Sequence, residues 1–199
     1  MYIIIILIIH SSIFFTNNLW GIKMKQKLLD LLKQLLNKYF DLPEKFFHQD
    51  NKYLITASMF GIGYFKKSPG TFASVIALVI GILISSISAK LFSVVVILCI
   101  IVGFFVCHKV SNEDMKTSNI VIDEFAGQFI AMMLVPNSLY LCFISFIIFR
   151  ILDIKKPSII GMAKHSFPKG MAIMMDDIIA GFIALISVLL LSTIDFLNF

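Results

Sequence analysis

The sequence has few charged residues: Asp, Glu, Lys and Arg make up 15% of its 199 residues, against 59% hydrophobic residues. Soluble domains usually contain about 45–50% apolar and about 25% charged residues. So little charge argues against a soluble protein and indicates that apolar side chains face lipid. The length allows one domain, not two.

Cysteine and arginine are scarce as well. The three cysteines, Cys99, Cys107 and Cys142, lie in apolar stretches without metal-ligand spacing, which excludes a disulfide framework and a zinc site. Arg150 is the only arginine, and the other 16 basic residues are lysines. Because these lysines flank apolar segments, the net charge of +5 indicates contact with anionic lipid and not with nucleic acid.

Long apolar runs are what the sequence has instead. A helix needs about 20 residues to cross about 30 Å of hydrocarbon, and the apolar run Ile122–Ile151 is interrupted by Pro136 and Asn137. Proline breaks helices, so we expect two short crossing helices, 122–135 and 139–151. The predicted fold class is all-α, a polytopic membrane helical bundle with about five membrane-crossing helices. The other expected crossing segments are Phe72–Ser88, Leu91–Cys107 and Ile178–Leu197.

Residues 1–52 are predicted to form an N-terminal extension to the membrane-embedded part, 53–199. The apolar segment 2–22 has no preceding Lys or Arg and so lacks the charged start of a signal peptide. Two interpretations stay open: an extra membrane helix, or upstream sequence before a true start at Met24. Residues 25–40 place leucines at helical spacing among lysines. This pattern predicts a basic amphipathic helix that lies on an anionic membrane or packs on the protein itself.

The lysines also predict which helix ends face the cytoplasm. Nine lysines fall between Lys23 and Lys67, and positively charged loops stay on the cytoplasmic side. Helices that run out and back from there leave the loops around Lys109 and Lys155 inside and Lys90 outside. In this topology a group of charged residues meets at one membrane face: Asp123, Glu124, Arg150, Asp153, Lys156, Asp176 and Asp177.

The carboxylates of this group need a positive partner, because like charges repel and acids at membrane helix ends are costly. Mg²⁺ is the natural candidate, since it takes oxygen ligands from carboxylates, waters and substrate phosphates. The adjacent pairs Asp123-Glu124 and Asp176-Asp177 are the predicted metal ligands. The alternative is that these acids only mark helix starts, where negative charge suits the helix dipole.

Arg150, Asp153 and Lys156 form a second charged pattern. Arg150 and Asp153 share a face if the helix continues through them, and Pro157 ends it. A guanidinium can hold two phosphate oxygens at once, which a lysine cannot. The alternative is a cluster of snorkelling side chains at the membrane interface.

A loop rich in glycine and proline precedes the helix expected at 72–88. It contains Gly61-Ile62-Gly63 and Ser68-Pro69-Gly70-Thr71, whose spacing is not that of the P-loop or the dinucleotide-binding fingerprint. Thr71 is predicted to cap the helix, whose free backbone N–H groups attract an anion. The alternative is a simple turn with a cap. We expect Lys67 and Thr71 to contact a bound anion.

Four blocks of the sequence together resemble the phosphatidylglycerophosphatase A family, over about residues 53–190. They occur in the family's order and with similar spacing. Each block alone is only moderately specific, whereas the ordered set is a strong signal. The blocks are Gly61-Ile62-Gly63 with Ser68-Pro69-Gly70-Thr71-Phe72; Ile120-Val121-Ile122-Asp123-Glu124-Phe125-Ala126-Gly127-Gln128; Phe149-Arg150-Ile151-Leu152-Asp153-Ile154-Lys155-Lys156-Pro157; and Met175-Asp176-Asp177-Ile178-Ile179-Ala180-Gly181.

The resemblance implies that residues 53–199 are the catalytic domain of a Mg²⁺-dependent phosphoric monoester hydrolase of the bacterial cytoplasmic membrane. Its substrate would be the lipid phosphatidylglycerophosphate, hydrolysed to phosphatidylglycerol and phosphate in phospholipid biosynthesis. The active site would face the cytoplasm. The expected residues are Asp123, Asp153 and Asp176 for catalysis; Asp123, Glu124, Asp176 and Asp177 for the metal; and Lys67, Thr71, Arg150 and Lys156 for the substrate.

The role of Asp153 stays open at this point: it could orient Arg150, bind metal, or act as base or nucleophile. The Asp-x-Asp nucleophile motif of the haloacid-dehalogenase phosphatases is absent, which favours direct attack by water. The alternative function is a membrane transporter or channel with acidic ion-binding residues. An ion path needs polar groups near mid-bilayer, whereas segments 72–88 and 91–107 carry no charge there. The sequence does not predict the oligomeric state.

Overall fold

The computed structural model divides the chain into two compact units, residues 1–42 and 43–199. Of the first unit only residues 38–41 are described. The predictions for segment 2–22 and for nearly all of helix 25–40 therefore lie outside the described residues. All helices of the bundle belong to the second unit. The described ranges are 38–41, 52–111, 117–135, 138–157, 160–162 and 167–197.

All elements in the described ranges are helices, which confirms the predicted all-α membrane bundle. Three of them, α4, α5 and the Lys169–Thr193 part of α9, are long and apolar enough to cross a membrane. Helices α6 and α7 are the two shorter helices predicted on either side of the proline. The bounds are α3 Lys52–Ala57, η2 Ile62–Tyr64, α4 Pro69–Ile87, α5 Ala89–Val110, η3 Thr117–Asn119, α6 Ile122–Met132, α7 Leu139–Lys155 and α9 Lys169–Leu197.

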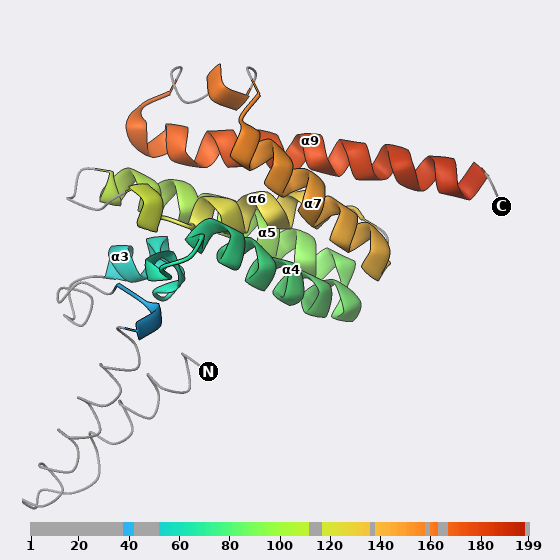
Figure 1. Ribbon diagram of the computed structural model, residues 1–199. Helices are drawn as coiled ribbons and strands as arrows, with labels where there is room; N and C mark the ends of the chain where they lie inside the picture. Colours follow the sequence, from blue (N-terminus) through green and yellow to red (C-terminus); the bar gives the residue numbers. More distant parts are fainter. Residues whose placement is uncertain are drawn as a thin grey trace, which may run out of the picture. The chain divides into compact units, whose positions relative to one another are not determined.

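Helix α6 is the interior helix of the bundle and contacts α4, α5, α7 and α9 (Figure 1). Nine of its 11 residues are buried. A helix of that length rises about 17 Å, less than the hydrocarbon thickness. Its shortness is tolerated because protein, not lipid, surrounds it. The outer faces of α4 and α5 instead expose apolar side chains such as Leu83, Ile87 and Ile101, as lipid-facing helices do.

Helix α4 begins with a proline and is joined to α5 by a single serine. Pro69 is the first residue of α4, a position that suits the fixed φ of proline. Ser88 is the single residue between α4 and α5, and its backbone is extended (φ −163°, ψ 123°). The Ser88 side chain accepts a hydrogen bond from the Leu91 N–H at 3.3 Å, which caps α5. This one-residue turn folds α5 back against α4.

The predicted start of the last helix, at Ile178, is wrong. Helix α9 begins at Lys169, so Asp176 and Asp177 lie two turns inside it. Pro168 precedes the helix, and its carbonyl oxygen accepts hydrogen bonds from the N–H groups of Met171 at 2.8 Å and Ala172 at 2.9 Å. The hydropathy pattern predicts that the helix starts after the two adjacent acids. In the structure the helix runs through both acids, because groups on α6 and at the end of α7 surround their carboxylates.

Two glycines set the close crossing of α6 and α9. A Cβ added to Gly181 would lie 2.5 Å from the carbonyl oxygen of Gly127. A Cβ added to Gly127 would lie 2.6 Å from the Phe149 ring and 2.8 Å from the Asp177 carbonyl oxygen. Small residues allow membrane helices to approach this closely. The crossing brings Asp177, one turn before Gly181, next to the first turn of α6.

Replacing Gly181 with alanine is expected to destabilise the bundle by about 1–3 kcal/mol, because backbone must move to admit the methyl group. Thermal unfolding in detergent, followed by circular dichroism, measures the effect. Gly161→Ala is the matched control, since a Cβ there would lie 3.5 Å from its nearest neighbour, the Lys156 carbonyl oxygen. Equal melting temperatures for the two variants would contradict the close crossing.

Candidate active site

Three carboxylates from two helices meet at one end of the bundle. Asp123 and Glu124 come from the first turn of α6 and Asp177 from α9, and one oxygen of each lies within 4.8 Å of the others. Gly70 in the first turn of α4 leaves the space that Glu124 occupies, because a Cβ there would collide with the Glu124 carboxylate. We call these three residues the carboxylate cluster.

Two oxygens of the carboxylate cluster lack a partner. Asp123 Oδ1 and Glu124 Oε2 are buried and accept no hydrogen bond from the described residues. Burying charged oxygens unpaired is costly, and three neighbouring acids repel one another. A divalent cation would remove both costs. The donor set consists of oxygen atoms only, which suits Mg²⁺, so Asp123, Glu124 and Asp177 are the residues able to hold it.

Arg150 of α7 forms hydrogen bonds with α4 beside the carboxylate cluster. Its Nη2 donates to Thr71 Oγ1 at 3.0 Å, and its Nη1 donates to Ser74 Oγ at 3.3 Å and to Asp153 Oδ2 at 2.5 Å. Helix α7 continues to Lys155, so the predicted shared face of Arg150 and Asp153 is confirmed. The orientation of the guanidinium is therefore set by three side chains from two helices.

Two details of α4 differ from expectation. The predicted cap at Thr71 is wrong: the helix begins at Pro69 with Ser68 at the N-cap position, and the Thr71 hydroxyl contacts Arg150 instead. Ser74 was not among the predicted site residues. Its hydroxyl donates to the Gly70 carbonyl oxygen at 2.9 Å and accepts from Arg150. The available signal was a serine three positions after Thr71, on the same helical face.

Lys156 is the second cation of the site. It follows the last residue of α7 with left-handed backbone (φ 40°, ψ 63°), and its ammonium group pairs with Asp176. Its Nζ also lies 3.7 Å from Asp153 Oδ1 and 4.0 Å from Asp177 Oδ1. Burial alone would lower the pKa of Lys156, but the hydrogen bond to Asp176 and the surrounding negative charges outweigh it and raise the pKa. The ammonium group therefore stays protonated near neutral pH.

The structure divides the predicted acids into two groups. Asp177 belongs to the carboxylate cluster, whereas Asp176 pairs with Lys156, because neighbouring helical residues point about 100° apart. Asp153 contacts Arg150 and Lys156. Lys67 is exposed in the loop before α4, and within the described residues it makes no hydrogen bond or ion pair with this site.

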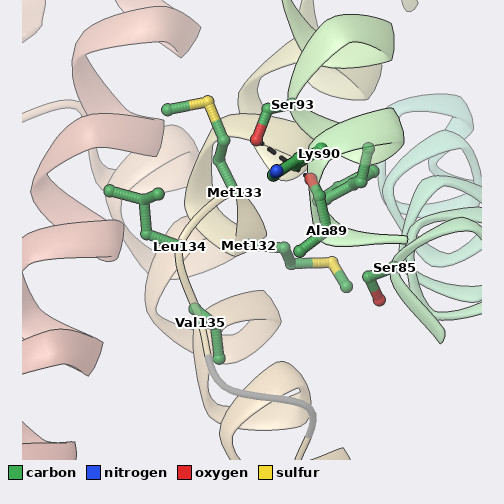
Figure 2. Close-up of a pocket in the computed structure, with 9 residues that line it drawn as sticks. Ser85, Ala89, Lys90, Ser93, Met132, Met133, Leu134 and Val135 are labelled. Carbon is green, nitrogen blue, oxygen red and sulfur yellow. Dashed lines mark hydrogen bonds between the residues drawn. The ribbon is translucent and has the colours of Figure 1, made fainter. Parts of the chain in front are cut away.

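A cavity of about 410 Å³ lies at the other end of α6, away from these charges. Figure 2 shows Lys90 and Ser93 from the start of α5, together with Met132 at the end of α6 and the segment that follows it, Met133 to Val135. Its lining contains one lysine, no acid and mostly apolar atoms. The chemistry of the chain is therefore concentrated at the opposite end, where α4 and α6 begin.

Replacing Lys156 with glutamine is expected to lower activity by about 10–100-fold and to lower the melting temperature. The substitution leaves the buried Asp176 carboxylate without its cation. Lys155→Gln is the matched control, because Lys155 is its exposed neighbour on α7 and should change activity less than about twofold. Equal effects of the two substitutions would show that the ion pairs of Lys156 do not matter.

Acidic side chains lie beside an arginine and a lysine at one end of an apolar helical bundle. This arrangement is the one expected of a membrane protein that binds phosphate groups. The family model described as Phosphatidylglycerophosphatase A matches residues 55–192. The chain belongs to this family. Membership confirms the resemblance of the four sequence blocks and the predicted class of enzyme, a phosphoric monoester hydrolase.

Three similar proteins come from bacteria. The phosphatidylglycerophosphatase A of Escherichia coli (strain K12) is 35% identical over 154 residues, covering 75% of this chain and 89% of the relative. That of Haemophilus influenzae is 35% identical over 134 residues, 65% of this chain and 82% of the relative. A Bacteroides thetaiotaomicron protein, provisionally named a phosphatidylinositol-3-phosphatase, is 32% identical over 134 residues, 61% of this chain and 82% of the relative. No solved structure matches the chain.

Proposed function

We propose that this protein is a Mg²⁺-dependent phosphatidylglycerophosphatase, which hydrolyses phosphatidylglycerophosphate to phosphatidylglycerol and phosphate in phospholipid biosynthesis. The observation that carries the proposal is the carboxylate cluster with unpaired oxygens beside Arg150 and Lys156. Two relatives named phosphatidylglycerophosphatase A, each 35% identical, support the choice of substrate. In this proposal the acyl chains stay in the bilayer while the headgroup phosphate reaches the charged end of the bundle.

Phosphoryl transfer depends mainly on positioning and charge neutralisation, and different residues of the site have these roles. Asp123, Glu124 and Asp177 hold Mg²⁺, which when bound polarises the phosphate and lowers the pKa of a coordinated water. Arg150 holds the phosphate oxygens; its Nε is buried without a partner among the described residues and is free to donate. Lys156 adds a second positive charge next to the cluster.

Asp153 and Asp176 act as positioning residues in this mechanism. Asp153 fixes the Arg150 guanidinium through the 2.5 Å hydrogen bond, and Asp176 holds the ammonium group of Lys156. Water attacks phosphorus and the bond from phosphorus to the glycerol oxygen breaks. One proton of the water passes to that oxygen, and the remaining hydroxyl stays on the phosphate that is released. Both acids are engaged by cations, which makes them poor nucleophiles and favours water as the attacking group.

We place the site at the cytoplasmic face of the inner membrane. Helix α5 ends with Lys109 in its last turn and α7 ends with Lys155, followed by Lys156. Gly170, near the start of α9, packs against His108 at the end of α5, and Lys156 after α7 pairs with Asp176 of α9, so the ends of α5 and α7 lie at the same end of the bundle as the cluster. Positively charged helix ends stay on the cytoplasmic side.

Purified protein in detergent is expected to release phosphate from phosphatidylglycerophosphate when Mg²⁺ is present. Removing the metal with EDTA should lower the rate by at least about 100-fold, because the carboxylates then repel the anionic substrate. Phosphatidic acid and phosphatidylinositol 3-phosphate are the comparison substrates and should react more slowly. A higher rate on either would reassign the substrate, and full activity in EDTA would remove Mg²⁺ from the proposal.

A further inference from the structure

Gln128 is a buried polar side chain that the mechanism above does not use. It is 0% exposed and is among the largest fully buried side chains of the protein. Neither its Oε1 nor its Nε2 has a hydrogen-bond partner among the described residues. Buried amides are almost always paired, because an unpaired one gives up its hydrogen bonds to water without replacement. Something outside the described protein atoms is therefore expected to contact this carboxamide.

The position of Gln128 on α6 places it directly beneath the carboxylate cluster. Glu124, Gln128 and Met132 follow one another at intervals of four residues and so share a helical face. That face packs on α4: Glu124 fills the space at Gly70, and Met132 lies against Gly81. Gln128 lies between these two contacts. The small α4 residues in that stretch, Ser74 and Ala77, are both fully buried.

Helix geometry directs the Gln128 side chain toward the cluster and not away from it. Side chains on a helix lean toward its N-terminus, over the preceding turn. The N-terminus of α6 carries Asp123 and Glu124, so the carboxamide reaches toward the turn that holds both acids. Four residues correspond to about 6 Å along the helix, a distance that a glutamine side chain largely spans.

In the described chain, the buried polar side-chain atoms that lack a hydrogen-bond partner all lie near the carboxylate cluster. There are five of them, on four residues: Asp123 Oδ1, Glu124 Oε2, Gln128 Oε1 and Nε2, and Arg150 Nε. Three of the four residues lie within six positions on α6, and the fourth joins the site through Thr71 and Ser74. Elsewhere in the described ranges the buried side-chain polar atoms have partners. Such a concentration indicates a common ligand.

We infer that Gln128 supplies a neutral oxygen to the coordination shell of the cation, from the bilayer-interior side of the cluster, either on the ion or through one ion-bound water. The inference rests on the Mg²⁺ site of the proposed function and adds a fourth oxygen donor to it. A neutral donor suits this position, because a fourth carboxylate would increase the repulsion among the three neighbouring acids. Gln128 is thus a positioning residue for the ion.

Mn²⁺ binding to detergent-purified protein, followed by electron paramagnetic resonance, tests the inference without an activity measurement. Gln128→Leu should raise the Kd for Mn²⁺ at least about 10-fold, as losses of supporting metal contacts do. Gln128→Glu keeps an oxygen at the position and should bind Mn²⁺ at least as tightly as the wild type. Met132→Leu, on the same face of α6, is the matched control and should leave the Kd unchanged within about twofold.

A second measurement separates this role from a structural one. In metal-free protein, Gln128→Leu should melt at the same temperature as the wild type or higher, because it removes an unpaired buried amide. A lower melting temperature would show that Gln128 has a structural partner and would overturn the inference. So would an unchanged Kd in Gln128→Leu. If the wild type itself bound no Mn²⁺, the Mg²⁺ site of the proposed function would fail instead.

Discussion

Asp177→Asn is expected to lower the rate of phosphate release by at least about 1,000-fold, which corresponds to about 4 kcal/mol of transition-state stabilisation. Asp177 is the only member of the carboxylate cluster that comes from α9, within 4.8 Å of Asp123 and Glu124. Asparagine keeps the shape and one oxygen but removes the charge that holds a divalent cation. The rate is measured as phosphate released from phosphatidylglycerophosphate at saturating Mg²⁺.

The fold should survive this substitution. Removing one of the three neighbouring acids relieves their mutual repulsion, so the melting temperature of the metal-free protein should stay the same or rise. Asp195→Asn is the matched control, because Asp195 lies on the same helix about 27 Å further along and should leave the rate unchanged. A rate within about tenfold of the wild type for Asp177→Asn would exclude Asp177 as a ligand.

Arg150→Lys is expected to lower kcat/KM by about 100–1,000-fold even though the positive charge remains. The guanidinium contacts Thr71, Ser74 and Asp153 at the same time, and its Nε remains available for a phosphate oxygen. A lysine ammonium is a single point and cannot keep these contacts while also holding the substrate. Initial rates over a range of substrate concentrations measure the loss.

Chemical rescue distinguishes a lost contact from a damaged fold. Arg150→Ala should regain part of its activity when methylguanidinium is added, because the small cation can occupy the space beside Asp153 and Thr71. The same compound should not rescue Asp177→Asn. Wild-type kcat/KM in Arg150→Lys would mean that charge alone is needed and that the geometry of the guanidinium is irrelevant.

The acids of the site were easy to find in the sequence because the bilayer makes them rare. Asp123, Glu124, Asp153, Asp176 and Asp177 stand out against apolar surroundings, where each carboxylate needs a compensating partner. The positions that shape the space around them were not found in this way. Gly127 and Gly181 look ordinary in an apolar run, and their importance becomes visible only when two helices are seen to cross there.

The different roles of Asp176 and Asp177 could likewise not be predicted from the sequence. Both were predicted as metal ligands, but the structure pairs Asp176 with Lys156 and places Asp177 in the carboxylate cluster. The prediction treated them as the charged start of a helix that in fact begins at Lys169. Once they lie inside a helix, their side chains face different neighbours, so adjacency in sequence no longer means a shared role.

The sequence by itself determined the helical class, the membrane environment, the family and the set of charged residues, because these follow from composition, local hydropathy and short ordered motifs. Tertiary structure alone decided which charges meet. It assigned Thr71 and Ser74 to Arg150, Asp176 to Lys156, and Glu124 to the space above Gly70. The physical reason is that pairing depends on the distance and rotation between packed helices, and these are set by small residues and by contacts far apart in the chain.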